Sequence, residues 1–382
     1  MLYFDHSAST PPYDEVIQTL YEVMKKHYAN PSSMHKLGVE ANQLIERSRA
    51  LIAKLFGTSG GKWLFTSGGT ESNNIALKGA AYHYRNRGNH IITTSIEHPS
   101  VFETVRRLEQ EGFEVTYLPV SAGGHITADQ VQEAITERTI LVSVMHVNNE
   151  VGAVQPIEQI GQLLRQYPKI LFHVDAVQSI GKLDIWPEEY GIDLLSGSAH
   201  KLRGPKGVGL LYVRCGVQLA PLRTGGSQEE GLAAGTENVP AIVATAKAVR
   251  LTMESRKENA SLYRKLSSRL RDGIAEIPEL KLNGEQPLAP HIVHFSYPGM
   301  RPEVMIHMLE QHQIMASTKS ACSSKEEKPS RILLAMGAEA GAAASGVRIS
   351  FGDEHTEADV DTLLSALRLT VSNLSHLERS NR

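Results

Sequence analysis

Lys201 ends the stretch SGSAHK, Ser196 to Lys201, which follows directly on a short apolar run. A lysine that is flanked by small residues at the end of a strand can be desolvated and held still. An amine needs both conditions to form a Schiff base with an aldehyde. A surface lysine in a turn is the alternative, and this stretch leaves both interpretations open.

Asp175 lies upstream in the stretch HVDAVQS, directly after the apolar run Ile170–Val174. The run is typical of a buried strand, and open α/β sheets bind ligands at the C-terminal edges of their strands. An aspartate at that edge can hold the N–H group of a pyridinium ring through a charge-assisted hydrogen bond. The N-cap of a helix is an equally ordinary place for an aspartate.

The turn TSGGTES, Thr66 to Ser72, lies between an expected strand and an expected helix. Its glycines let the backbone approach an anion closely, and free N–H groups at the start of a helix favour phosphate. The P-loop pattern GxxxxGKS/T of nucleotide-binding proteins is absent. A phosphate cradle, an acid for a ring nitrogen and a lysine for an aldehyde together form the set that pyridoxal 5′-phosphate needs.

Strand-length apolar runs alternate with helix-period segments through the first half of the chain, and these elements must position the three groups. The alternation predicts an α/β fold with a doubly wound, mostly parallel sheet. Helices are expected to begin at Thr70, Pro99, Ala128 and Pro156. The expected strands are Lys62–Thr66, His90–Thr94, Glu114–Leu118, Thr139–His146, Ile170–Val174, Leu194–Leu195 and Val208–Val213.

The alternation of strands and helices ends near Asn238. A long helical region, which we interpret as two helices, runs from there to about Glu276. Shorter elements follow, and a final helix is expected from Thr356 with Asp359 completing a capping box. We therefore expect a large α/β domain over residues 13–257 and a smaller α+β domain formed by residues 1–12 and 258–382. The shorter elements are His291–Phe295, Pro302–Gln311, Ile314–Ser317 and Val347–Phe351.

Composition excludes several classes of protein. The 382 residues carry 39 Lys+Arg against 42 Asp+Glu, a net charge of −3, so direct nucleic-acid binding is disfavoured. Two cysteines, Cys215 and Cys322, cannot build a disulfide framework. We find no signal-peptide pattern and no long uncharged apolar run. The expectation is a cytoplasmic protein without a membrane partner.

The chain resembles the cysteine desulfurases of the NifS/IscS group, within the pyridoxal-phosphate-dependent class V aminotransferases, over essentially its whole length. The resemblance implies the fold-type I architecture, in which a large doubly wound domain carries a smaller α+β domain. It rests on ordered blocks, of which the most specific are HVDAVQS, SGSAHKLRGPKGVG and SACSS. The other blocks are YFDHSAST, NPSSMHKLG, TSGGTESNN, EHPS, MHVNNEVGAVQPI, AGTEN and VRISFG.

The resemblance assigns cofactor contacts to residues of these blocks. It implies that Lys201 carries the cofactor and later moves the substrate's α-proton, that Asp175 pairs with the ring nitrogen, and that His98 stacks on the ring and can transfer a proton. Asn149 and Gln178 match positions that hydrogen-bond the ring and its phenolic oxygen. The phosphate-binding positions are Gly69, Thr70, Ser198 and His200, with Thr236 reaching the phosphate of the neighbouring subunit in a homodimer.

The resemblance also implies the substrate and the sulfur carrier. Arg348 is expected to bind the carboxylate of L-cysteine, since a guanidinium fork fits a carboxylate bidentately, and Asn30 and His35 match an active-site loop. Cys322 lies in a small, polar loop that we expect to be mobile, between Lys319 and Lys325, whose charges favour the thiolate. It would take the sulfur as a persulfide and pass it to an iron–sulfur scaffold protein or a tRNA-thiolation enzyme. An iron–sulfur intermediate on Cys322 is a further implication of the resemblance.

Alternatives remain at the level of the sequence. A selenocysteine lyase or a related aminotransferase would use the same scaffold, although a transaminase has no use for Cys322. A low-activity paralogue that serves as a binding platform is suggested by Ala233, which replaces an arginine usual in the family and predicts reduced activity. Cys215 is expected to pack near a strand end. The Ala-rich stretch GAEAGAAASG, Gly337 to Gly346, receives no function.

Overall fold

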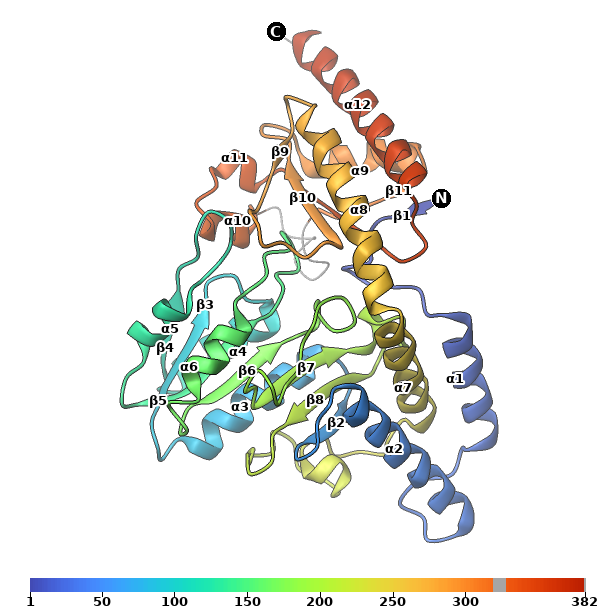
Figure 1. Ribbon diagram of the computed structural model, residues 1–382, viewed down its shortest axis with the longest axis vertical. Helices are drawn as coiled ribbons and strands as arrows, with labels where there is room; N and C mark the ends of the chain where they lie inside the picture. The colour runs from blue at the N-terminus through green and yellow to red at the C-terminus, as the bar shows by residue number, and fades with distance from the viewer. Residues whose placement is uncertain (319–327, 381–382) are drawn as a thin grey trace.

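A seven-stranded sheet forms the centre of the larger part of the molecule (Figure 1). The computed structural model describes residues 1–318 and 328–380. Strand β8 is antiparallel to its neighbours β2 and β7. The strands from β7 through β6, β5 and β3 to β4 are parallel to one another. The spatial order is β2 (Lys62–Thr66), β8 (Gly209–Val213), β7 (Leu194–Ser198), β6 (Leu171–Asp175), β5 (Thr139–Met145), β3 (His90–Thr94) and β4 (Glu114–Leu118). The predicted mostly parallel sheet is confirmed.

Helices cover both faces of this sheet because its strands are apolar on both sides. One face packs on α3 (Gly69–Tyr84) and α4 (Pro99–Gln110), whose buried side chains form one core with the strands. The other face packs on a second group of helices. These are α2 (Lys36–Leu55), α5 (Ala128–Ala134), α6 (Ile157–Leu164) and α7 (Val239–Glu254). Helix α1 (Asp14–Lys26), which the strand–helix alternation did not predict, lies along α7.

The smaller part has a core of its own, built around residues such as Phe4, Leu266 and Phe295. Its antiparallel sheet has the order β12 (Gly346–Ser350), β10 (Ile292–Ser296) and β9 (Lys281–Leu282). A parallel pair joins β1 (Leu2–Tyr3) to β11 (Ile314–Met315), so the N-terminus adds a strand to this part. Its helices are α8 (Arg256–Ala275), α9 (Pro302–Gln311), α10 (Arg331–Ala335), α11 (Ala340–Ala343) and α12 (Glu357–Ser380).

Two expectations about the helices are confirmed, the division of the long helical region and the capping box of the last helix. The long helical region is two helices, α7 and α8, which meet at Ser255. At the start of α12, the Thr356 N–H donates to Asp359 Oδ2 at 2.8 Å, and the Asp359 N–H donates to Thr356 Oγ1 at 3.3 Å. No helix within the described ranges is both long and apolar enough to cross a membrane.

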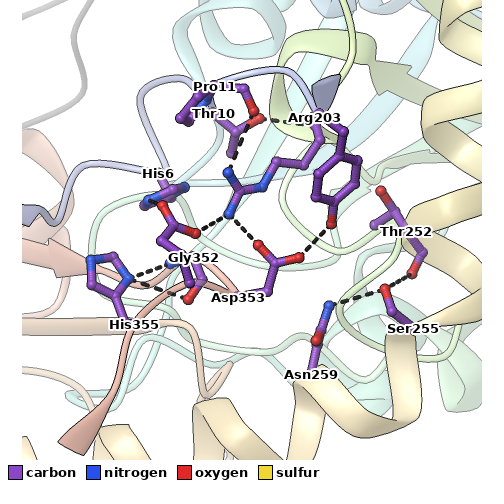
Figure 2. Close-up of polar contacts among 12 residues, drawn as sticks. His6, Thr10, Pro11, Arg203, Thr252, Ser255, Asn259, Gly352, Asp353 and His355 are labelled. Atoms are coloured by element: carbon purple, nitrogen blue, oxygen red, sulfur yellow. Dashed lines mark hydrogen bonds and ion pairs between the residues drawn. The ribbon is translucent and has the colours of Figure 1, made fainter. Parts of the chain in front are cut away.

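A polar network around Arg203 ties the two parts together just beyond Lys201 (Figure 2). The Arg203 guanidinium contacts the carboxylates of Asp353 and Glu354, between β12 and α12. The Arg203 N–H also donates to Thr10 Oγ1 at 2.9 Å. Glu354 Oε1 lies 3.0 Å from His6 Nε2, and His355 brings a third ligand-type atom to this group, all within 4.8 Å. The Arg203 cation opposes a metal ion there, so we interpret the group as an ion-pair network.

The network predicts a loss of stability in acid. Burial raises the pKa of Glu354, but the contact with His6 and the charge of Arg203 outweigh this effect and hold the pKa well below its ordinary value. A depressed folded-state pKa stabilises the protein above the unfolded pKa, and this contribution is lost as the pH falls from about 5. Because half of the side chain is exposed, we expect Glu354→Gln to lose only about 1 kcal/mol of unfolding free energy at pH 7.

Urea unfolding at pH 7, 5 and 3.5 measures this effect. The difference between wild type and Glu354→Gln should shrink as the pH falls. Glu133→Gln, at an exposed position of α5, is the matched control and should follow the wild type at each pH. A constant difference across the three pH values would contradict the assignment.

Candidate active site

A cavity of about 220 Å³ opens where the C-terminal ends of β6 and β7 face the start of α3. Parallel strands end at the same edge of a sheet, so groups at these ends converge although they are far apart in sequence. Ten of the predicted site residues line the cavity. They are Gly69, Thr70, His98, Asn149, Asp175, Gln178, Ser198, His200, Lys201 and Arg348.

Lys201 follows β7 at the end of a single 3-10 turn, Ala199–Lys201. Its Nζ donates hydrogen bonds to the backbone carbonyls of Ser7 and Ala8, which themselves line the cavity. The N-terminal segment therefore holds the amine at the cavity wall. The motif YFDHSAST signalled that this segment belongs to the site, but its carbonyl contacts with Lys201 could not be inferred from the sequence.

Asp175 is the last residue of β6 and is buried. Its Oδ2 accepts a hydrogen bond from Asn73 Nδ2 at 2.8 Å, and its Oδ1 accepts one from the Val177 N–H at 3.0 Å. The carboxylate is thus oriented by donors on both oxygens. Asn73 was missed by the sequence reasoning, although it lies four residues after Gly69, and this spacing places both on one face of α3.

The start of α3 forms one end of the cavity. Gly68 gives this helix no side-chain cap, so the N–H groups of its first turn are open to an anion. A Cβ added at Gly69 would lie 2.8 Å from Val177 Cγ2, so the backbone of Gly69 packs closely against the Val177 side chain and leaves no room for a larger residue. Burial, together with the charges of Lys201, Lys206 and Lys182, lowers the pKa of His200 to about 4. The same cations favour phosphate at this end.

Arg348 lies on β12 at the other side of the cavity and is only 1% exposed. Its Nη1 donates to the Asn149 carbonyl at 2.7 Å, and its Nη2 contacts Asp5 Oδ1 at 2.9 Å. Its Nε is buried and has no hydrogen-bond partner among the described residues. The guanidinium is therefore held rigidly at the cavity with donor capacity to spare, as binding of a carboxylate requires.

Three predicted residues within the described ranges, Thr236, Asn30 and His35, do not line this cavity. Thr236 is exposed and lines a separate cavity that also includes Ala233. Asn30 and His35 are exposed in the connection from α1 to α2, where the Asn30 side chain accepts from the Ser32 N–H and His35 caps α2. Cys322 lies outside the described residues.

The expectation that Cys215 packs is wrong. The thiol is exposed, because β8 ends at Val213 and the chain turns outward through Arg214, Cys215 and Gly216. A hydrophobic run of five residues before a cysteine does not reveal where the strand leaves the core.

The residues present fit pyridoxal 5′-phosphate. The open first turn of α3 suits the phosphate, the buried Asp175 carboxylate suits a protonated ring nitrogen, and Lys201 Nζ suits the aldehyde. Gln178 also points to a missing polar group, because its Oε1 is buried without a hydrogen-bond partner in the described structure while its Nε2 donates to the Ser7 carbonyl at 2.9 Å. The cavity thus offers a site for each end of this cofactor.

Known proteins match the chain along nearly its full length. Residues 2–363 match the aminotransferase class-V family. A Clostridium botulinum (strain Hall) protein named "Cysteine desulfurase IscS" is 42% identical over 370 residues, covering 96% of this chain and 93% of that protein. The solved structure of a "NIFS-LIKE PROTEIN" superposes with a TM-score of 0.90 at 37% identity, covering 97% of this chain and 99% of that one.

A further solved structure, "SspA in complex with cysteine", superposes with a TM-score of 0.80 at 36% identity and covers 92% of this chain and 99% of that one. The fold, the cavity and these matches agree on one family. The chain belongs to the aminotransferase class-V family of pyridoxal-phosphate-dependent enzymes.

Proposed function

We propose that the chain is a cysteine desulfurase, which takes sulfur from L-cysteine, leaves L-alanine and stores the sulfur as a persulfide on Cys322. The observation that carries the proposal is the single cavity that gathers Lys201, Asp175, His98 and Arg348. The name of the Clostridium botulinum relative and the cysteine bound in the SspA structure support it.

Each polar residue of the cavity would have a separate role in the reaction. When bound, pyridoxal 5′-phosphate supplies an aldehyde for the substrate amine and a ring that withdraws electrons from the α-carbon. Asp175 would hold the proton of the ring nitrogen, and Arg348 would hold the substrate carboxylate. Lys201 Nζ, kept at the cavity wall by the Ser7 and Ala8 carbonyls, would remove the α-proton and return a proton to the product.

Cys322 would complete the reaction. Its thiolate attacks the substrate sulfur, so a sulfur–sulfur bond forms as the carbon–sulfur bond breaks and the electron pair of that bond passes to carbon. The balance is L-cysteine plus the enzyme thiol giving L-alanine plus the enzyme persulfide, and no external oxidant is needed. The persulfide would then pass to an acceptor that builds iron–sulfur clusters or thiolates tRNA.

The enzyme is proposed to work as a cytoplasmic homodimer. The exposure of Thr236, away from the cavity of its own chain, supports a role toward the neighbouring subunit. We also propose the division into residues 13–257 and residues 1–12 with 258–382, which the separate hydrophobic cores of the two parts support.

A Cys322→Ala variant tests the proposal. Incubation of the wild type with ³⁵S-labelled L-cysteine should label the protein in a form that a reducing thiol releases, whereas the variant should remain unlabelled. Since the variant lacks the sulfur acceptor, its alanine production should fall on the order of a hundredfold or more. Cys215→Ala is the matched control, because this thiol is exposed and remote from the cavity, and it should behave as the wild type. Full labelling of Cys322→Ala would refute the proposal.

A further inference from the structure

A continuous chain of hydrogen bonds joins Asp175 to His98 through Asn73 and Ser100. Asn73 Nδ2 lies 2.8 Å from Asp175 Oδ2 and 2.8 Å from Ser100 Oγ. Ser100 Oγ lies 2.8 Å from His98 Nδ1. Asn73, Ser100 and Asp175 are all buried, so water does not compete for these contacts. Helix α3, helix α4 and strand β6 each contribute to the chain.

The direction of each hydrogen bond follows from the donors available. The two hydrogens of Asn73 Nδ2 go to Asp175 Oδ2 and Ser100 Oγ, because the amide nitrogen donates and does not accept hydrogen bonds. The hydroxyl of Ser100 then donates to His98 Nδ1. The backbone N–H of Ser100, which can only donate, points to the same nitrogen at 3.2 Å. His98 Nδ1 therefore accepts twice and carries no proton.

We propose that Asn73 and Ser100 are positioning residues that hold His98 as the neutral imidazole with its proton on Nε2. This leaves Nε2–H as the ring N–H group of His98 that can donate a hydrogen bond to a ligand in the cavity. In the resting enzyme His98 is then a hydrogen-bond donor and a flat surface for the cofactor ring, whereas the task of proton acceptor falls to Lys201. The inference rests on the proposed function for its catalytic meaning, but the geometry of the four side chains stands without it.

The charges around His98 agree with a neutral ring. Burial lowers the pKa of His98 below its usual value, Asp175 opposes this effect, and the cations of Lys201 and Arg331 add to it. Arg331, the first residue of α10, donates to the backbone carbonyls of Ser95 and Glu97 beside His98. Protonation at Nδ1 would also place a new N–H against the two donors of Ser100.

Long-range ¹H–¹⁵N spectra of the histidine rings test the proposal in the purified protein, with and without cofactor. An unprotonated ring nitrogen resonates far from a protonated one, and the loss of signals in His98→Gln assigns the ring. We expect an unprotonated Nδ1 and a protonated Nε2 throughout pH 6–8. A proton on Nδ1, or a cationic ring at pH 7, would overturn the proposal.

Ser100→Ala removes the hydroxyl and keeps the backbone N–H. It should raise the apparent pKa of His98 by about one pH unit, as expected for the loss of one hydrogen bond to the neutral form. Ser100→Thr keeps a hydroxyl and should restore the wild-type titration, and Asn73→Ala provides a second break in the chain. If neither break moves the titration of His98, the positioning role is refuted. None of these spectra needs cysteine turnover, so failure of the desulfurase proposal and failure of this inference are distinguishable.

Discussion

A Lys201→Ala variant is expected to lose nearly all cysteine turnover, with kcat lower by about 10³-fold, within the range for removal of a positioned acid–base group. The physical reason lies in the placement of the amine. Lys201 Nζ is held at the cavity wall by the carbonyls of Ser7 and Ala8, so the substitution removes an amine that the fold has positioned in the cavity. The covalent attachment of the cofactor should vanish with it.

Two measurements check this expectation. Turnover is followed as alanine formation, and covalent attachment is followed by borohydride reduction, after which the denatured wild type should keep the cofactor and the variant should not. Lys201→Arg keeps a cation but cannot form the linkage, so it should be as inactive as Lys201→Ala. Lys169→Ala, at an exposed position remote from the cavity, is the control for lysine removal. Retention of reduced cofactor by Lys201→Ala would contradict the assignment.

Arg348→Ala is expected to lower kcat/KM for L-cysteine by about 10²- to 10³-fold, the effect of losing charge-assisted hydrogen bonds worth about 3–4 kcal/mol in a buried site. The guanidinium is anchored between the Asn149 carbonyl and Asp5, and its Nε, which has no hydrogen-bond partner in the described part of the chain, leaves donor capacity for a carboxylate. Most of the loss should appear in KM, because we propose that Arg348 binds the substrate carboxylate rather than the reacting bonds.

The same substitution also leaves Asp5 without its cation, so stability has to be measured beside activity. The melting temperature should fall, since removing one partner of a largely buried ion pair is destabilising. Arg348→Lys keeps the charge near Asp5 but loses the fork geometry, and should recover stability while KM stays raised. Arg301→Ala, exposed at the start of α9, is the control. An unchanged KM in a folded Arg348→Lys would exclude Arg348 from carboxylate binding.

The amino-acid sequence alone determined several strands of the large sheet. The runs Lys62–Thr66, His90–Thr94 and Glu114–Leu118 have the same bounds in the structure. A strand that is buried on both faces, such as His90–Thr94, shows as a continuous run without charged residues. Lys201 and Asp175 could be placed at strand ends for the same reason. Helices α1 and α2 were missed, since the alternation that marked the other helices begins only after them.

Only the tertiary structure decided what surrounds these groups. The partners of Lys201, Asp175 and Arg348 are separated from them by up to 194, 102 and 343 residues, and no local pattern reports contacts across such distances. Ser7, Ala8, Asn73 and Asp5 therefore emerged from the fold. The family resemblance implied that His98 stacks on the cofactor ring and can transfer a proton. Its tautomer follows from the packing of α3 against α4 and β6, because the hydrogen bonds that set it exist only when those three elements meet.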